Sequence, residues 1–405
     1  AFTTVTGSNG VTSLVGTTGI DTATIVTLDS NVFIGANTGD DTITTALGTG
    51  GNNISGMNAR LGGGDDAFVQ GDTILDSFIS LDGETLANDG NDTFTAGGAA
   101  NLIINSEIVG RGGNDDIGAT GAGLFLSGST VNGNTGLDDI FIDQSSASFV
   151  YGGAETDTIT VEGASTAVLV NGNKGSDILT VNNVTFSAGS VYGGAGNDTI
   201  TVNSTTDGIL VSGDNGIDTI NTAGGDDTIN GGADADTINA AGGTDTIDGG
   251  AGADTITGGA GADTITGGAG NDLFVYTALA DSVLTSATSN TGFDTISDIS
   301  FSTHAGAAAI NGDSFQVAVA GAGLDNAGNV AAGAGALTSL AATLANTFGA
   351  GTFAANEIGA ITITGGNSFD GNYIVINDGT LGYAFAADAV IKVNTLTGIS
   401  TDTFV

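Results

Sequence analysis

Apolar residues recur at one fixed place in a short motif along most of the chain. An Asp is followed by a polar residue, an apolar residue and another polar one, as in Asp254-Thr-Ile-Thr257 and Asp263-Thr-Ile-Thr266. An apolar residue between two polar ones is the alternation of a strand that buries one face. Glycine-rich segments separate these strands and favour tight turns, because glycine adopts positive φ easily. The pattern predicts many short strands joined by turns.

The Asp of this motif returns at two intervals. Upstream the motifs lie 19 to 26 residues apart, and from residue 218 they lie nine apart. A short fixed period predicts a solenoid of stacked coils. The Asp residues are Asp21, Asp41, Asp66, Asp92, Asp115, Asp138, Asp157, Asp177, Asp198, Asp218, Asp227, Asp236, Asp245, Asp254, Asp263 and Asp272.

The two intervals agree if one coil contains two half-turns. In the nine-residue region each half-turn carries an Asp, so a coil has 18 residues. Upstream, the half without Asp is expected to carry an apolar strand, as at Val32–Ile34, Leu102–Ile104, Leu124–Leu126, Val168–Val170 and Ile209–Val211. We therefore expect one long column of about thirteen Asp residues and a second column of three, Asp227, Asp245 and Asp263.

Residues 213–275 are seven contiguous nonapeptides of the form G-G-x-G-x-D-x-U-x, where U is apolar. This stretch resembles the calcium-binding RTX repeats of secreted bacterial proteins. The resemblance implies that the sixth-position Asp and the carbonyls of the glycine-rich turn bind calcium between adjacent coils. The glycines that match best are Gly231, Gly249, Gly250, Gly252, Gly258, Gly259, Gly261, Gly267, Gly268 and Gly270.

The charge balance agrees with a calcium-binding protein. The chain has 45 acidic residues, four basic ones and a formal charge of −41. A column of carboxylates one coil apart would repel itself, and Ca²⁺ is a hard cation that prefers oxygen ligands. About fourteen ions would leave a net charge near −13. So few Lys and Arg residues argue against nucleic-acid binding, and no apolar run is long enough for membrane insertion.

The segment after Val275 has a different pattern. Strands are expected at Ala360–Thr364, Tyr373–Ile376, Tyr383–Ala386 and Val390–Val393, and a helix at Ala334–Phe348. The segment resembles the C-terminal region of serralysin-type proteases, through Phe274-Val-Tyr, Asp281-Ser282 and Phe293-Asp-Thr-Ile-Ser-Asp298. The ending, Asp402-Thr-Phe-Val405, is similar to a type I secretion signal. These resemblances imply an extracellular or cell-surface protein exported by a type I system.

The fold class expected is all-β: a right-handed parallel β-roll or β-helix stapled by calcium, with a small, mostly β cap that contains one helix. The expected domains are a roll with one Asp turn per coil (1–212), a nonapeptide roll with Asp on both edges (213–275) and a capping and secretion region (276–405). Without calcium the chain is expected to be largely unfolded.

Nothing in the sequence predicts an enzyme. Paired carboxylates such as Asp40-Asp41 and Asp138-Asp139 fall in the frame of the metal motif, so we interpret them as metal sites rather than a glycosidase pair. His304 is the sole His, which excludes an H-E-x-x-H zinc site, and no G-x-S-x-G motif occurs. We interpret His304 as a loop residue of the cap.

The favoured function is an extracellular structural protein that self-associates, in the presence of calcium, into a surface layer, filament or matrix. In this it resembles bacterial RTX surface-layer proteins. Cell-surface polysaccharide is a further candidate partner. One alternative is the calcium-binding C-terminal portion of a secreted RTX hydrolase or adhesin. Another is an ice- or glycan-binding solenoid, based on outward Thr pairs such as Thr199/Thr201.

Overall fold

The structure is a computed structural model that describes residues 2–6, 12–25, 32–45, 53–82, 90–96, 102–119, 123–182, 186–203, 208–278, 281–282, 292–299, 313–317, 323–331, 344, 357–364, 370–377 and 389–395. The described residues are nearly all β, and most strands run parallel to their neighbours. The chain forms two compact units, Ala1–Asn215 (unit 1) and Gly216–Val405 (unit 2).

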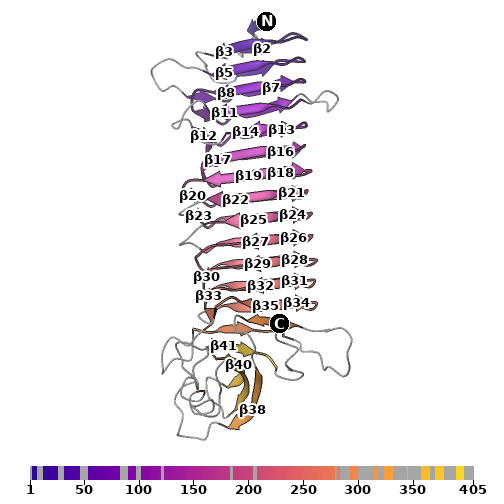
Figure 1. Ribbon diagram of the computed structural model, residues 1–405. Helices are drawn as coiled ribbons and strands as arrows, with labels where there is room; N and C mark the ends of the chain where they lie inside the picture. The colour runs from indigo at the N-terminus through magenta and orange to yellow at the C-terminus, as the bar shows by residue number, and fades with distance from the viewer. Residues whose placement is uncertain are drawn as a thin grey trace. The chain divides into compact units, whose positions relative to one another are not determined.

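One stack of strands in unit 1, sheet A, contains one long strand from each coil (Figure 1). Its first two strands, β1 and β2, are antiparallel, and every later pair is parallel. The strands are β1 (Thr3–Thr6), β2 (Thr12–Val15), β4 (Val32–Gly35), β7 (Asn58–Gly62), β10 (Phe78–Asp82), β13 (Glu107–Arg111), β16 (Thr130–Thr135), β18 (Phe149–Ala154), β21 (Leu169–Lys174), β24 (Ser190–Ala195) and β26 (Leu210–Asn215).

A second stack in unit 1 follows the Asp turns. It consists of β3 (Thr22–Ile25), β5 (Thr42–Thr45), β8 (Ala67–Gln70), β11 (Thr93–Ala96), β14 (Asp116–Ile117), β17 (Asp139–Ser146), β19 (Thr158–Glu162), β22 (Ile178–Asn182) and β25 (Thr199–Val202). A third stack consists of β6 (Ile54–Ser55), β9 (Ile74–Leu75), β12 (Leu102–Ile104), β15 (Leu124–Ser127), the end of β17, β20 (Ser165–Thr166) and β23 (Phe186–Ser187).

Many coils of unit 1 therefore have three strands, where the sequence predicts two. Leu102–Ile104 and Leu124–Leu126 lie in the third stack, whereas Val32–Ile34 belongs to sheet A. The residues expected at Val168–Val170 and Ile209–Val211 lead into sheet A strands as well. The prediction merged two positions of the coil because both carry apolar strands of similar length. Coils longer than 18 residues have room for the extra strand.

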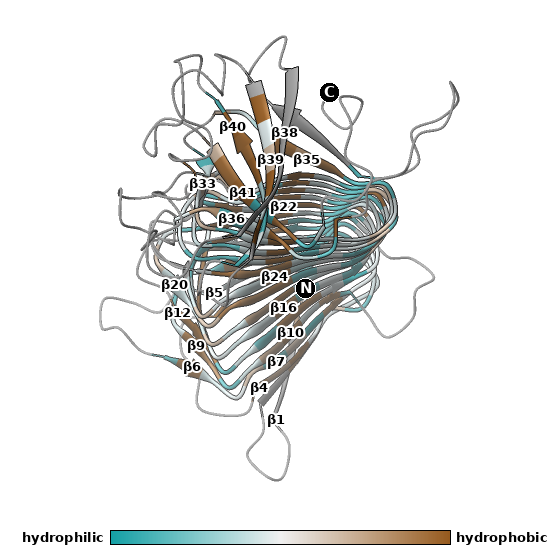
Figure 2. Ribbon diagram, turned by 90° about the horizontal axis from the view of Figure 1, so that it is seen from below, coloured by the Kyte–Doolittle hydropathy of each residue, from teal (hydrophilic) through white to brown (hydrophobic). Residues whose placement is uncertain are grey.

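Inward-pointing apolar residues form the core of unit 1. Ile79, Ile108 and Val131 follow one another in register along sheet A, and none is accessible to solvent. From the second stack, Phe68 and Phe94 stack their rings with centroids 5.1 Å apart. In Figure 2, hydrophobic and hydrophilic residues alternate along strands such as β7 and β16. Each such buried side chain contributes about 1.5–3 kcal/mol.

Unit 2 begins with coils of 18 residues. One ladder is β28 (Thr228–Ala233), β31 (Thr246–Ala251), β34 (Thr264–Ala269) and β36 (Asp294–Ile296); the other is β27 (Thr219–Asn221), β29 (Thr237–Asn239), β32 (Thr255–Thr257), β35 (Leu273–Tyr276) and β37 (Ser314–Val317). A two-residue pair, β30 (Gly242–Gly243) and β33 (Ala260–Gly261), joins turns. Thr228 pairs with Thr246 and Thr219 with Thr237, so alternate motifs stack, as the parity of the repeats predicts.

The rest of unit 2 adds β38 (Gly323–Ala331), β39 (Glu357–Thr364), β40 (Gly371–Ile376) and β41 (Ala389–Val393). Strands β39, β40 and β41 are antiparallel neighbours, and β41 also pairs with β36. Three of the four strands expected after residue 350 are confirmed, and Tyr383–Ala386 lies outside the described residues. Of the helix expected at Ala334–Phe348, only Leu344 is described; it is helical and buried.

Candidate calcium sites

The sixth-position Asp residues of unit 1 form a column along one edge of the coils. The main-chain N–H of each Asp donates a hydrogen bond of 2.6–2.9 Å to Oδ1 of the Asp one coil further on, without interruption from Asp21 to Asp198. Every Asp of the column is at most 2 % exposed. The coil-by-coil stacking that the spacing predicts is confirmed for this unit.

Unit 2 has two such columns, on opposite edges of its coils. One joins Asp218, Asp236, Asp254, Asp272 and Asp313, and the other joins Asp227, Asp245, Asp263 and Asp294, with N–H to Oδ1 distances of 2.8–3.0 Å. The prediction that the second column has three members is therefore wrong. The residues it missed carry the same signal, in Asp294-Thr-Ile296 and Asp313-Ser-Phe315. Intervals of 31 and 41 residues hide them from a search for a period.

The second carboxylate oxygen of these residues is in a different situation. Oδ2 of Asp66, Asp115 and Asp157 is buried and accepts no hydrogen bond from any residue that the structure describes, and the same holds for Asp236, Asp245 and Asp263. A buried carboxylate oxygen without a partner is strongly unfavourable, since it has lost its water and gained nothing in exchange. A cation beside Oδ2 would remove this cost.

The first glycine of the motif leaves room for such a cation. A Cβ placed on Gly249 would lie 2.6 Å from Oδ2 of Asp254 and 2.5 Å from the carbonyl oxygen of Gly267, one coil further on. Gly172 lies in the same way between Asp177 and the carbonyl of Gly193. Carboxylate and carbonyl oxygens thus converge on a space that any side chain would fill. Both are ligands that Ca²⁺ prefers, so the residues fit the ion.

The second and fourth glycines shape the turn. Gly250, Gly259 and Gly268 have φ of +101°, +93° and +97°, and the fourth-position glycines Gly252 and Gly261 have φ of +157° and +156°. Residues that carry a side chain rarely adopt these φ values. The predicted glycine residues are therefore placed by the structure in the turns around the Asp columns, either lining the space beside Oδ2 or turning the backbone toward it.

Upstream motifs that lack the second glycine keep the same backbone. Asn134 and Asn173 stand at this position, in the turns of Asp138 and Asp177, with φ of +77° and +74°. Asn is the residue, after glycine, that best tolerates this region. The missing second glycine predicts that the sites at these turns are weaker or empty. Their Asp residues nevertheless occupy the same column as the others.

Burial raises the pKa of several column carboxyls in both units. It raises the pKa of Asp66 and Asp157 to about 8 and that of Asp115 to about 9; the hydrogen bond from the preceding Asp N–H opposes this rise, and the neighbouring carboxylates add to it. In unit 2, burial raises the pKa of Asp236 and Asp245 to about 7. Ionised carboxylates in such positions require a positive partner.

The remaining titratable candidates do not form a second kind of site. Within the described ranges no three His, Asp or Glu side chains cluster as metal ligands, so an ion in a column depends on main-chain carbonyls besides carboxylates. In the adjacent pairs one carboxylate is buried and its neighbour exposed, as for Asp115 and Asp116 or Asp138 and Asp139. His304 lies outside the described residues.

A serine column occupies another corner of unit 1, formed by Ser77, Ser106, Ser129 and Ser148, all buried. Each accepts a hydrogen bond of 3.0–3.2 Å at Oγ from the N–H of the corresponding residue one coil earlier, beginning with Met57. Each hydroxyl also donates to the carbonyl two residues before it, over 2.7–3.1 Å. This column satisfies itself without a cation. Its members lie 29, 23 and 19 residues apart, so no fixed period in the sequence predicts it.

Comparison with known proteins agrees with the geometry. Residues 190–209, 212–247 and 240–274 match the family model of the RTX calcium-binding nonapeptide repeat. No curated protein matches the chain. The match ends at residue 274, so the resemblance of the C-terminal segment to serralysin-type proteases stays a prediction. RTX repeats bind calcium and are typical of secreted proteins. Between residues 190 and 274 the chain therefore consists of RTX calcium-binding repeats, folded as coils of a β-solenoid.

Proposed function

We propose that this protein is an extracellular structural protein, not an enzyme, that folds on calcium and self-assembles into a surface layer, filament or matrix. The observation that carries the proposal is the repeated buried carboxylate in both units, whose Oδ2 lacks a partner at positions such as Asp115 and Asp245. Each of these carboxylates also accepts a hydrogen bond from the main chain of the preceding coil, so it is part of the fold itself. Their number and regularity fit a scaffold better than a single binding or catalytic centre.

Calcium would be held along all three columns. Within the two units, adjacent Asp residues of a column define eight intervals in unit 1 and seven in unit 2, close to the fourteen ions expected from the sequence. Bound calcium supplies charge neutralisation and links successive coils. Calcium-dependent folding suits export by a type I system, because the chain would stay unfolded where calcium is scarce and fold outside the cell.

The outer surface supports self-association through calcium. Several buried Asp residues have an exposed acidic neighbour, namely Asp40, Asp65, Asp116, Asp139 and Asp226. Carboxylates that remain in solvent can share a divalent ion with those of a second copy. The outward Thr residues favour the ice-binding alternative less, because Asp139 and Ile178 stand on either side of Thr158 in the register of the second stack.

Light scattering and electron microscopy of the purified chain test the proposal. We expect large, ordered assemblies at millimolar calcium and dispersed, unfolded chains in chelator. The double variant Asp116→Asn/Asp139→Asn is expected to fold with calcium but to assemble less, while Lys174→Gln serves as a surface control. A folded protein that stays monomeric at millimolar calcium would contradict self-assembly. That result would favour the alternative that the chain is the calcium-binding portion of a secreted hydrolase or adhesin.

The described residues contain no helix long and apolar enough to cross a membrane.

A further inference from the structure

The outer face of sheet A in unit 1 has a trough between two walls. Along one line of the register, Arg60 is followed by the shorter Ser80, Val109 and Asn132 and then by Tyr151. Along the parallel line, Phe78 is followed by Glu107 and Thr130 and then by Phe149. Bulky side chains stand at both ends, with shorter ones between them. The trough crosses strands β10 to β18, roughly 14 Å at ordinary strand spacing.

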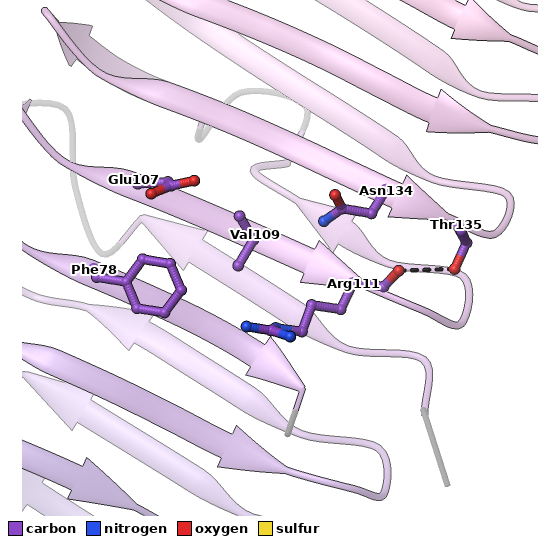
Figure 3. A pocket seen from close by; sticks show the side chains of 6 residues that line it. All are labelled: Phe78, Glu107, Val109, Arg111, Asn134 and Thr135. Carbon is purple, nitrogen blue, oxygen red and sulfur yellow. Dashed lines mark hydrogen bonds between the residues drawn. The ribbon is translucent and has the colours of Figure 1, made fainter. Parts of the chain in front are cut away.

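One part of the trough is a depression of about 370 Å³, lined by Phe78, Glu107, Val109, Arg111, Asn134 and Thr135 (Figure 3). Figure 3 shows the Arg111 side chain extending toward the ring of Phe78, with Val109 and Glu107 on the same strand as Arg111. The lining combines a ring, a carboxylate, an amide and a guanidinium. Sites of this mixed kind bind ligands that have both apolar faces and many hydrogen-bonding groups.

Positive charge is concentrated at this trough. The chain has only four basic residues, and two of them, Arg60 and Arg111, flank Phe78 from the strands on either side. The guanidinium carbon of Arg60 lies 5.7 Å from the centroid of the Phe78 ring. Arg111 donates its Nε–H to Oγ of Ser80 over 2.7 Å, which fixes the plane of its guanidinium. The sequence places these arginines 51 residues apart, and the coils bring them together.

The opposite wall is aromatic. The rings of Phe149 and Tyr151 lie nearly parallel, with centroids 6.3 Å apart and an interplanar angle of 3°. Phe149 is 44 % exposed, although it sits in a regular strand where a polar residue would be expected. The flat rings of the half-buried Phe78 and the exposed Phe149, one at each end of the trough, offer two stacking platforms for the C–H faces of sugar rings.

We propose that this trough binds an acidic polysaccharide, with a uronate-type sugar carboxylate held by Arg111 and the sugar rings stacked on Phe78 and Phe149. A planar guanidinium recognises a carboxylate through two parallel hydrogen bonds, and Arg60 adds positive charge beside it. Glu107 and Asn134 accept from and donate to sugar hydroxyls. The length of the trough suits a few linked pyranose rings. This inference does not depend on self-assembly.

The net negative charge of the protein does not prevent such binding. Charges more than about 8–10 Å apart are largely screened at physiological salt, so the groups of the trough itself decide the local charge. Arg60 and Arg111 together outweigh the single carboxylate of Glu107 there. Calcium in the Asp columns lowers the remaining repulsion. Binding of an acidic sugar by the calcium-loaded protein is therefore expected to be stronger than the formal charge of −41 would suggest.

The test is titration of the full chain, folded in calcium, with a trigalacturonate and with the neutral maltotriose, followed by calorimetry. We expect the trigalacturonate to bind and the neutral sugar to bind at least about tenfold more weakly, because a charge-assisted bidentate contact is lost. Arg111→Asn and Phe78→Thr should each weaken trigalacturonate binding about five- to tenfold or more. The matched control, Lys174→Gln, removes a positive charge from the same sheet outside the trough and should bind like the wild type.

The two variants are chosen so that the fold survives. Arg111 has φ of +88°, and Asn134 holds the equivalent position in the next coil with φ of +77°. Thr130 occupies the line of Phe78 in the register, two strands further on. Circular dichroism in calcium verifies folding of each variant. The proposal is overturned if the folded wild type does not bind trigalacturonate, if the neutral sugar binds equally well, or if neither substitution weakens binding.

Discussion

Two columns of side chains hold successive coils of unit 1 together, and both accept a hydrogen bond from the main-chain N–H of the coil before. In the serine column, the hydroxyl of Ser129 also donates its proton to a carbonyl, so the hydroxyl both accepts and donates a hydrogen bond. In the Asp column, Oδ1 of Asp138 accepts the same kind of bond, but Oδ2 has no proton to donate and stays buried without a partner among the described residues. One corner is complete by itself, and the other needs a cation.

The same position of the coil is filled differently in the two units. Ser77 and Ser106 stand immediately before strands β10 and β13, and in unit 2 Asp227 and Asp245 stand immediately before β28 and β31. The hydrogen bond to the preceding coil is kept in both cases. Replacing Ser by Asp at this position therefore changes a self-sufficient corner into a calcium-dependent one. We expect unit 2, with Asp on both edges, to depend on calcium more than unit 1.

Calcium removal should have the largest effect and should separate the two units. Excess chelator at pH 8 is expected to abolish most β structure, because each uncompensated buried carboxylate costs several kcal/mol. When calcium is lowered stepwise, amide hydrogen exchange should show residues 218–275 losing protection before the coils of the serine column, residues 77–148. Equal β content with and without chelator in circular dichroism would contradict this.

Acidification should act in opposite directions with and without calcium. Because burial raises the pKa of Asp66, Asp157 and Asp245 to about 7–8, the folded chain without calcium binds protons that the unfolded chain releases above pH 4. Stability in chelator should thus be highest below about pH 4 and fall steadily as pH rises from about 4 to 8. With calcium, protons compete with the ion, so stability should fall on acidification.

Thermal melts between pH 4 and pH 9, in calcium and in chelator, measure these opposite pH dependences of stability. Chloride salts at equal ionic strength serve as the control for screening. Two curves with the same slope would show that the column carboxylates are not the groups that respond to calcium.

Asp245→Asn should reverse its effect with calcium. Asn keeps the Oδ1 acceptor for the N–H of Asp227 but carries no charge. In calcium the variant should lose about 2–4 kcal/mol of unfolding free energy through the lost ligand. In chelator at pH 6, where the buried carboxyls of the folded chain are still largely protonated, the variant should gain about 1–3 kcal/mol, because folding no longer requires residue 245 to take up a proton. Urea unfolding followed by circular dichroism measures both values. The control is Asp248→Asn, at an exposed residue of β31.

Ser129→Ala should destabilise unit 1 by about 1–3 kcal/mol, since the buried N–H of Ser106 loses its acceptor. The change should be the same at high and low calcium, unlike that of Asp245→Asn. Hydrogen exchange of Ser106 and its neighbours reports it directly. The neighbouring Ser127→Ala, on the half-buried side of β15, is the matched control. A calcium-dependent effect of Ser129→Ala would mean that the serine column is not independent of the ion.

Ala241→Gly should give the smallest effect, a gain of about 0.5–1 kcal/mol in calcium. Ala241 has φ of +63° at the second motif position, where Gly250 and Gly259 stand in the neighbouring turns. Glycine removes the strain of this conformation, although it gives the unfolded chain more freedom. Ala233→Gly, in the regular strand β28, should instead destabilise. Thermal melts in calcium compare the two variants.

Much of the candidate site could be predicted because its signal is local. The motif Asp-x-apolar-x identifies the column residues one by one. The inward apolar residue beside each Asp shows which face of the strand is buried. Asp294 and Asp313 carry the same motif, but a search for a fixed period does not find them. The intervals of 31 and 41 residues before them break the period. A search for the motif without a fixed spacing finds both residues.

The amino-acid sequence by itself determined the stacking of short strands, the Asp turn and the need for a cation, because each of these follows from a local motif of nine residues. The third strand in many coils of unit 1 was decided by the tertiary structure. Only the tertiary structure decided which distant residues share a corner or a face. Ser77, Ser106 and Ser129 align although 29 and 23 residues separate them, and Arg60, Phe78 and Arg111 lie on successive strands of one sheet. Segments between strands absorb the differences in coil length, so the hydrogen-bond register, and not the count of residues, sets what lies beside what.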